Sequence, residues 1–428
     1  MSLHAPQRRR CRSDQRPLQP LAPLWVLLPE LHFSGETKPQ SIRCALAAHE
    51  APALHRLIVI VVNASTDSVA SWLPVAARRL SGDLRFVNIA SGRNDATTRN
   101  EAGPFDLPCF ESASSIKLDL GLGWLGLALP PSGVFSCLTN LYLRHVQLYG
   151  PCRLGDVVSS PRCPVLRRLA VRDAWGLGNL TIHSKSVLQM ELNSLYDLQQ
   201  LTVVAPALQE LTVSSCFDNV CRSSQPVVNI SAPQLVMLRW SDAFNPSSVE
   251  LGNVAHLESL DTSYFLVYGP DEVASNASCL MMLSQFKAIH HLNLNLAYMP
   301  DIFSNDRYLI EDMTRLPGVT FLSLLMMANG HSFGATLFHV LRMCTGVRKL
   351  ALEYLEPFQP QTVCPSGCIC EQLPNWKTEE LVLGGLQEVE IVELTGTEHE
   401  AAFVQQLFRW ATVVKKMTVS FREGFVCS

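Results

Sequence analysis

Apolar residues recur along most of the chain in a six-residue pattern whose first, fourth and sixth positions are leucine or a similar residue. The alternation at the end of each unit predicts a short strand with one buried face. Nine such units follow one another, and the spacing between their starts is irregular. Their three positions are Leu138-Leu141-Leu143, Leu166-Leu169-Val171, Val187-Met190-Leu192, Leu208-Leu211-Val213, Leu235-Leu238-Trp240, Leu257-Leu260-Thr262, Ile289-Leu292-Leu294, Val319-Leu322-Leu324 and Val347-Leu350-Leu352.

Successive units start roughly 20–30 residues apart, which suits one strand and one return segment per turn of a leucine-rich solenoid. Each turn leaves an apolar edge that only the next turn covers, so no single repeat is stable alone. We therefore predict an α/β repeat fold, an irregular leucine-rich-repeat solenoid (horseshoe) with parallel strands on its concave face. An ordinary α/β domain with amphipathic strands is the alternative, and nine near-periodic units argue against it.

The segments between units predict the convex side. Two weaker units, Leu177-Leu180-Ile182 and Leu198-Leu201-Val203, fall halfway between main units and predict extended segments there. The longer spacers at 298–316 and 330–344 predict helices in the later repeats. Many leucine-rich repeats carry Asn or Cys at the ninth position of the unit, and here only Cys216 conforms. The repeat type is therefore divergent.

Composition narrows the function classes. The formal net charge of −4 provides no overall positive field that favours nucleic acid or an anionic membrane. The longest uncharged apolar stretch, 120–143, is interrupted by glycines and prolines, so we expect no membrane-spanning helix. Fourteen scattered cysteines are too few for a disulfide scaffold and favour a reducing compartment, the cytoplasm and/or the nucleus.

An extracellular repeat receptor is a further hypothesis. Arginines 8–10 followed by the apolar residues 21–28 weakly resemble a signal peptide, and glycosylation sequons occur at Asn63, Asn179, Asn229 and Asn276. This hypothesis predicts occupied sequons and disulfides. The apolar run is short and contains Pro23, which argues against secretion.

A glycine motif invites a phosphate-binding interpretation. Residues 121–126 match G-x-G-x-x-G after a strand-like segment. A phosphate site needs a helix that begins at the glycines. Pro130, Pro131 and Gly133 forbid that helix, so we predict a connection between repeats.

Three cysteines, Cys364, Cys368 and Cys370, lie close together in the sequence. Zinc is one interpretation, but a structural site needs four ligands at other spacings. Because the sequence places no further pair of Cys or His nearby, we expect structural turn cysteines and no metal. The chain also lacks the H-E-x-x-H and G-x-S-x-G patterns, and we predict no catalytic site, no cofactor and no enzyme activity.

The C-terminal residues resemble a known family, the plant F-box proteins that combine leucine-rich repeats with an FBD-type module. The similarity is carried by 364–370, 373–377, 386–391, by Gly396, His399-Glu400, Phe403 and Leu407, and by 416–421. From its own residues this region predicts a β-α-β step, with strands at 388–394 and 416–421 and a helix at 398–412. Trp376 is expected to anchor its loop by packing.

The N-terminal part resembles the same family. Residues 23–33 are similar to the segment after an F-box, and 49–57 to the first repeat region. In the family the F-box is a helical module that docks on a ligase adaptor. The segment 1–22 before the matching residues is too short for such a module, so we expect the F-box to be missing or truncated. The expected organisation is a disordered basic segment (1–22), a post-F-box-like segment leading into the first repeats (23–55), the solenoid (56–360) and an FBD-like module (361–428).

Two functions follow from the resemblance and the repeat surface. The first is a protein-interaction module that serves as the substrate-recognition arm of an SCF-type (cullin–RING) ubiquitin ligase. The alternative is an F-box-less scaffold or competitor, possible for a truncated gene product, that binds a partner without ligase recruitment. Binding is expected at outward-facing strand positions, above all a basic patch near Arg144, Arg168 and Arg172. The candidate residues are Asn140, Tyr142, Arg144, Arg168, Arg172, Asn293 and Asn295, with Glu191, Asn193, Arg239, Asp261, Lys349 and Glu353 at equivalent positions.

Overall fold

The computed structural model describes residues 24–35, 37–89, 103–121, 125–217, 226–303, 305–344, 346–355, 367–371 and 376–422. The segment 1–22, for which we predicted disorder, lies outside the described residues, and so does Cys364. Among the described residues no helix has the length and the apolar character needed to cross a membrane.

One parallel sheet of 17 strands runs through the molecule. The long strands each pair with the next long strand along the chain, and the short β4 and β6 pair beside β7. All nine sequence units supply one strand each, which confirms the predicted solenoid. In chain order the strands are β1 (Glu30–Gly35), β2 (Leu54–Val62), β3 (Leu80–Ile89), β4 (Phe105–Asp106), β5 (Ser115–Asp119), β6 (Gly126–Ala128), β7 (Asn140–Tyr149), β8 (Arg168–Trp175), β10 (Gln189–Leu195), β12 (Glu210–Ser214), β14 (Met237–Ser241), β16 (Ser259–Leu266), β18 (Ala288–Ala297), β20 (Gly318–Met327), β21 (Lys349–Tyr354), β22 (Glu388–Leu394) and β23 (Lys416–Phe421).

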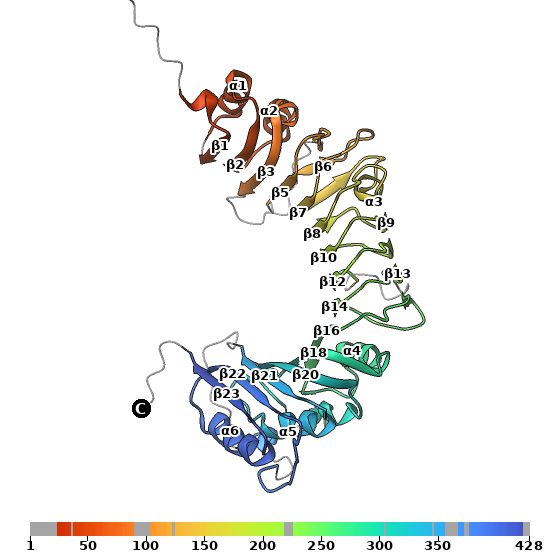
Figure 1. Cartoon of the computed structure of the whole chain (residues 1–428), viewed down its shortest axis with the longest axis vertical. Helices are drawn as coiled ribbons and strands as arrows, with labels where there is room; N and C mark the ends of the chain where they lie inside the picture. The colour runs from red at the N-terminus through yellow and green to blue at the C-terminus, as the bar shows by residue number, and fades with distance from the viewer. Residues whose placement is uncertain are drawn as a thin grey trace, which may run out of the picture.

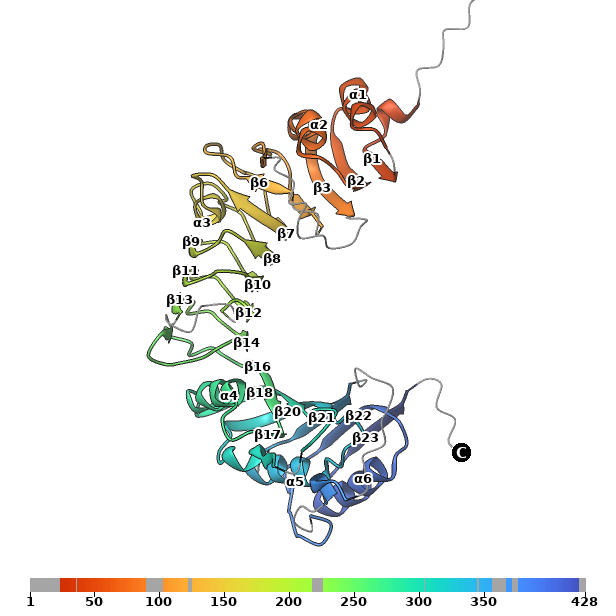
Figure 2. The ribbon, with the colours of Figure 1, turned by 180° about the vertical axis from the view of Figure 1, so that it is seen from behind.

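The sheet lines the inner side of an arc, and the return segments form its outer side (Figure 1 and, from behind, Figure 2). In the shorter repeats between β8 and β16, the return segments are extended and pair into a second parallel sheet. Longer repeats place helices there instead. The second sheet holds β9 (Asn179–His183), β11 (Gln200–Val204), β13 (Val227–Ser231) and β15 (Val249–Leu251), and the helices are α1 (Pro39–Ala48), α2 (Thr66–Arg79), α3 (Leu154–Val158), α4 (Ala274–Ser284), α5 (Gly334–Met343), α6 (Glu398–Trp410) and the 3₁₀ turns η1 (Leu24–Leu27), η2 (Leu309–Asp312) and η3 (Ile369–Glu371).

The helix predicted within 298–316 is wrong. The described residues of this segment, 298–303 and 305–316, contain only η2 and the strand β19 (Arg307–Tyr308), which pairs antiparallel with β17 (Tyr268–Gly269). Pairing with β17 uses backbone groups that a helix would need, and Pro300 interrupts the apolar pattern at its start. The helix predicted within 330–344 is confirmed as α5.

A left-handed residue ends the straight part of several strands. At the eighth position of the unit, His145, Asp173, Ser194 and Ser215 have φ between 50° and 51°. If side chains alternated strictly along the strand, the side chain at the eighth position would point into the core. The left-handed bend instead directs the side chain at the ninth position inward. The ninth residues are therefore buried, and they are the apolar Val146, Ala174, Leu195 and Cys216. This bend explains how the repeat closes its core without the usual asparagine.

The C-terminal β-α-β step is confirmed by β22, α6 and β23. Helix α6 begins at a capping box formed by Thr397 and Glu400. Trp376 packs against Trp410 of α6, with ring centroids 6.2 Å apart. Its ring also lies so close to Gly334 at the start of α5 that a Cβ there would be 2.1 Å from it. The predicted anchoring role of Trp376 is therefore visible as packing between two helices.

Candidate protein-binding surface

A shallow groove of about 320 Å³ lies on the concave face across β5, β7, β8, β10 and β12. It is lined by two rows of outward-facing side chains, because neighbouring strands are in register. Adjacent members of a row are about 4.8 Å apart, the spacing of paired strands. One row is Ser115, Asn140, Arg168, Gln189 and Glu210, and the other is Lys117, Tyr142, Ala170, Glu191 and Thr212.

Tyr142 lies in the middle of this groove, between side chains from the neighbouring strands. The ammonium nitrogen of Lys117 lies 4.7 Å from the centre of its ring, and the guanidinium carbon of Arg172 lies 5.7 Å from it. Such cation–π contacts fix an aromatic side chain while leaving part of it accessible. Tyr142 is half-buried, so it presents a held aromatic surface to a partner. The sequence pattern identified Tyr142 but not Lys117.

Two arginines of the predicted basic patch are paired with carboxylates. The Arg144 Nε donates to Asp173 Oδ2 at 3.2 Å, and the Arg172 Nη2 donates to Glu191 Oε2 at 2.7 Å. These hydrogen bonds raise the pKa values of both guanidinium groups. Arg168 is exposed in the groove. The surface around the three arginines is therefore an ion-pair network with mixed charge, and its role in binding stays a prediction.

His145 strengthens that network. Its Nδ1 lies 2.8 Å from Asp119 Oδ1, and its Nε2 lies 3.5 Å from Asp173 Oδ2. The left-handed conformation of His145 places the ring between these two carboxylates at the ends of three neighbouring strands. The network joins the ends of β5, β7 and β8, outside the residues that line the groove.

Of the three predicted asparagines, Asn140 lies in the groove and the other two lie elsewhere. Asn293 and Asn295 belong to β18, which is separated from β8 by β10, β12, β14 and β16. The Asn295 side-chain amide donates to the Thr262 carbonyl at 2.6 Å and to Asp261 at 3.2 Å, across an irregularity in β16. Its amide hydrogens therefore stabilise the sheet. The structure does not bring the two asparagines to the groove.

A further row of outward-facing side chains, on the later strands of the concave face, was not identified from the sequence pattern. His291 stacks on Phe321 with ring centroids 4.1 Å apart, and the Lys349 ammonium nitrogen lies 4.7 Å from the centre of the Phe321 ring. These three residues occupy matching positions on β18, β20 and β21. The sequence pattern identified only Lys349, although His291 and Phe321 stand at the third position of their units, where outward side chains are expected.

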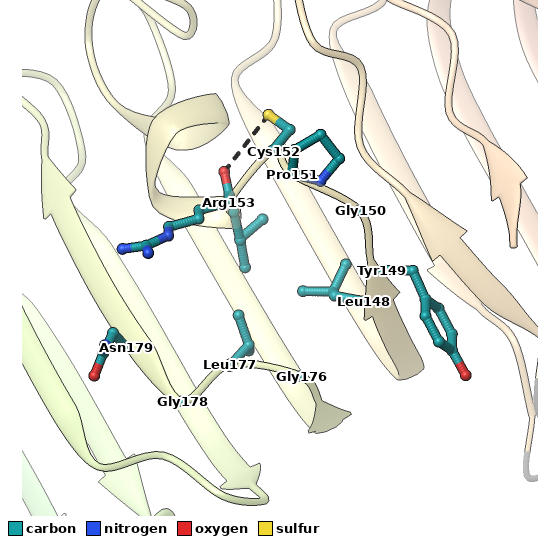
Figure 3. Close-up of a pocket in the computed structure, with 11 residues that line it drawn as sticks. Leu148, Tyr149, Gly150, Pro151, Cys152, Arg153, Gly176, Leu177, Gly178 and Asn179 are labelled. Carbon is teal, nitrogen blue, oxygen red and sulfur yellow. Dashed lines mark hydrogen bonds between the residues drawn. The ribbon is translucent and has the colours of Figure 1, made fainter.

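A separate hollow of about 390 Å³ lies where β7 and β8 run into their return segments. Figure 3 shows that backbone turns at Gly150, Gly176 and Gly178 form much of its wall, with Arg153 directed along it. The Cys152 thiol lies against the Arg153 carbonyl oxygen at 3.9 Å. The residues that line the hollow include no acid–base pair.

The other sequence motifs resolve differently. Within the described part of the glycine motif, Gly126 opens the strand β6, and 125–133 contains no helix, so the phosphate interpretation has no helix to support it. Of the cysteine motif, Cys368 and Cys370 are described, and both contact His331, far earlier in the chain. Sequence spacing gives no sign of this approach. Among the described residues these three form the one group of at least three potential metal ligands.

Comparisons with known proteins agree with the repeat geometry. The family description "FBD-associated F-box protein At5g56370, LRR repeats" matches residues 69–262. A putative F-box/FBD/LRR-repeat protein of Arabidopsis thaliana, At4g03220, is 25% identical over 316 residues, which are 71% of this chain and 62% of that protein. Both comparisons support a plant protein of the F-box/FBD/LRR type. The residues that match the family description, 69–262, contain every strand that lines the groove. The alignment with the Arabidopsis protein covers 62% of that protein's length.

Proposed function

We propose that the chain is the substrate-recognition arm of an SCF-type ubiquitin ligase and holds a partner protein in the concave groove around Tyr142. The observation that carries the proposal is the groove itself, which lies inside the region that matches the repeats of F-box proteins. Tyrosine and arginine are among the residue types that dominate protein interfaces energetically. Both stand here on rigid, hydrogen-bonded strands, so binding orders few side chains.

The charge of the groove supports a protein partner over a polyanion. Lys117 and Arg168 on one side face Glu191 and Glu210 on the other, within the same lining. A nucleic acid would meet the two carboxylates as well as the cations, at a cost in repulsion. A protein surface that carries charges of both signs can pair with the cations and with the carboxylates of the groove.

The same proposal includes a location of the protein in the cytoplasm and/or the nucleus. The thiols of Cys163, Cys279 and Cys344 are buried outside disulfides. Burial raises the pKa of Cys163 and Cys344 to about 12 and that of Cys279 to about 11. Protonated, buried thiols of this kind suit a reducing compartment.

The ligase role is tested with the purified chain and the small adaptor subunit of the ligase in a pull-down, with an intact F-box protein as positive control. Saturable association supports the recognition-arm proposal. If the adaptor fails to bind while the partner still binds, the ligase role is wrong and the chain acts as a scaffold or competitor without recruitment.

The groove is tested by proximity labelling in plant cells, comparing the wild type with Tyr142→Ala and with Thr181→Ala on the convex strand β9. Loss of a specific set of labelled proteins with Tyr142→Ala, and their retention with Thr181→Ala, supports the groove. Identical labelling by all three chains contradicts it. Cross-linking of the recovered partner to Lys117 supplies the direct contact.

A further inference from the structure

Three buried side chains, from two segments that are far apart in the sequence, lie close together next to the start of α5. His331 lies in the turn between β20 and α5 and is 2% exposed, while Cys368, just before η3, and Cys370, within it, are 8% and 2% exposed. The residues before His331 are Asn329 and Gly330, both left-handed with φ of 48° and 81°. This sharp turn, closed by the His331 N–H donating to the Ala328 carbonyl at 2.9 Å, directs the imidazole inward.

The two nitrogen–sulfur separations are those of a tetrahedral metal site. The Nδ1 of His331 lies 3.6 Å from the Sγ of Cys368 and 3.6 Å from the Sγ of Cys370. All three atoms lie within 4.8 Å of one another. Zinc–sulfur bonds of about 2.3 Å and zinc–nitrogen bonds of about 2.05 Å at the tetrahedral angle require an N···S separation of about 3.6 Å. Both observed separations match this value.

The second nitrogen of the imidazole is occupied in the manner of a metal ligand. The Nε2 of His331 lies 3.1 Å from the carbonyl oxygen of Pro300, and a carbonyl only accepts, so Nε2 carries the proton. Nδ1 is then unprotonated and directs its single lone pair at the two sulfur atoms. Metal-bound histidines commonly donate their other N–H to a backbone carbonyl, which fixes the tautomer and the ring orientation.

The alternative is a pair of thiol hydrogen bonds to the imidazole. One lone pair accepts one S–H donor well, and it does not explain two sulfur atoms at the same distance. Stacking on Tyr298, with ring centroids 5.9 Å apart and an interplanar angle of 16°, holds the ring in place.

We propose that His331, Cys368 and Cys370 supply three of the four ligands of a zinc ion that fastens the start of the FBD-like module to the turn between β20 and α5. Thiolate and imidazole are the ligands that structural zinc prefers. The ion would close the loop between His331 and Cys368, beside the contact of Trp376 with Gly334. Its function is structural, because it lies far from the concave groove on the helical side of the sheet. The proposal replaces the expectation of turn cysteines without a metal, since sequence spacing does not reveal the histidine.

The test measures metal in the intact chain purified from zinc-supplemented culture. We expect about one tightly held zinc per chain by elemental analysis, and X-ray absorption with at least two sulfur ligands at about 2.3 Å and one nitrogen at about 2.0–2.1 Å. Replacement by Co²⁺ should give thiolate charge-transfer absorption and the intense visible bands of a tetrahedral ion. A metal-free wild type, or a zinc ion bound only by oxygen and nitrogen, overturns the proposal without reliance on any variant.

Variants then assign the ligands. His331→Gln and the double variant Cys368→Ser/Cys370→Ser should each lower zinc affinity at least about tenfold, an effect that even the loss of an outer-shell partner has. Cys344→Ser, which removes another buried thiol, should leave zinc content unchanged. Circular dichroism checks that each variant is folded. Folded His331→Gln that retains the wild-type cobalt spectrum contradicts the assignment, whatever the outcome for the groove or the adaptor.

Discussion

The side-chain amide of Asn276 in α4 forms two hydrogen bonds with one residue, Leu266 at the end of β16. Its Oδ1 accepts from the Leu266 N–H, and its Nδ2 donates to the Leu266 carbonyl oxygen, both at 2.8 Å. Asn276 is 6% exposed. The asparagine thus satisfies backbone groups that the strand leaves open where it ends. A glycan on Nδ2 would need solvent access that this buried side chain lacks, so this sequon does not support the extracellular hypothesis.

Asn276→Asp should destabilise the solenoid. The variant keeps the acceptor for the Leu266 N–H but replaces the donor with a second oxygen, which faces the Leu266 carbonyl in a buried site. We expect the free energy of unfolding to fall by about 2–4 kcal/mol, measured by urea denaturation. The matched control is Asn253→Asp, because exposed Asn253 uses its Oδ1 as acceptor from the Ala255 N–H, and Asp keeps that acceptor. Equal midpoints for the two variants would contradict this role.

Glu400 should stabilise the C-terminal step far more than its neighbour Glu398. Its carboxylate accepts from the N–H groups of Thr395, Gly396 and Thr397, at 3.0, 2.7 and 2.9 Å for the shortest contacts. Glu400→Ala should therefore lower the free energy of unfolding by about 2–3 kcal/mol, the range of hydrogen bonds to charged groups. Hydrogen exchange at 395–397 should become faster. Glu398→Ala, at an exposed position, should change neither quantity.

Much of the fold is predictable from sequence because burial in a solenoid repeats with the chain. Leu141, Leu169 and Leu211 occupy one position of the unit, and all are buried in strands of the same sheet. The convex side is less predictable, since its structure depends on spacer length and on partners such as β17, which the spacer 298–316 does not reveal. His331 and Cys368 are separated along the chain by α5 and β21, and only the tertiary fold brings them together. No local pattern contains that information.

Acid should destabilise the protein partly through His291. Burial lowers its pKa, and the neighbouring His290 lowers it further. Because the folded-state pKa lies below the unfolded value of about 6.5, the unfolded state binds the proton first. Stability is thus intact above about pH 6.5 and is lost as the pH falls below it. His291→Gln should show a smaller drop in urea midpoint between about pH 7.5 and 5.5 than the wild type, and His183→Gln, at an exposed position, should behave like the wild type.

Tyr142 should be the most sensitive position for partner binding. Its ring lies between Lys117 and Arg172, so its removal takes away aromatic contact area and releases both cations. Truncating an interface tyrosine of this kind costs about 2 kcal/mol or more, roughly a thirtyfold rise in Kd. Titration calorimetry with the partner recovered by proximity labelling measures the change.

The control for this prediction is Tyr149→Ala. Tyr149 belongs to the same strand β7 and is 42% exposed, but it lines the hollow at the strand end and not the groove. Its removal should leave Kd within about twofold, which is below about 0.5 kcal/mol. Tyr142→Phe keeps the aromatic face and should lose less affinity than Tyr142→Ala. An unchanged Kd for Tyr142→Ala together with a weakened Tyr149→Ala would move the binding surface from the concave groove to the strand ends.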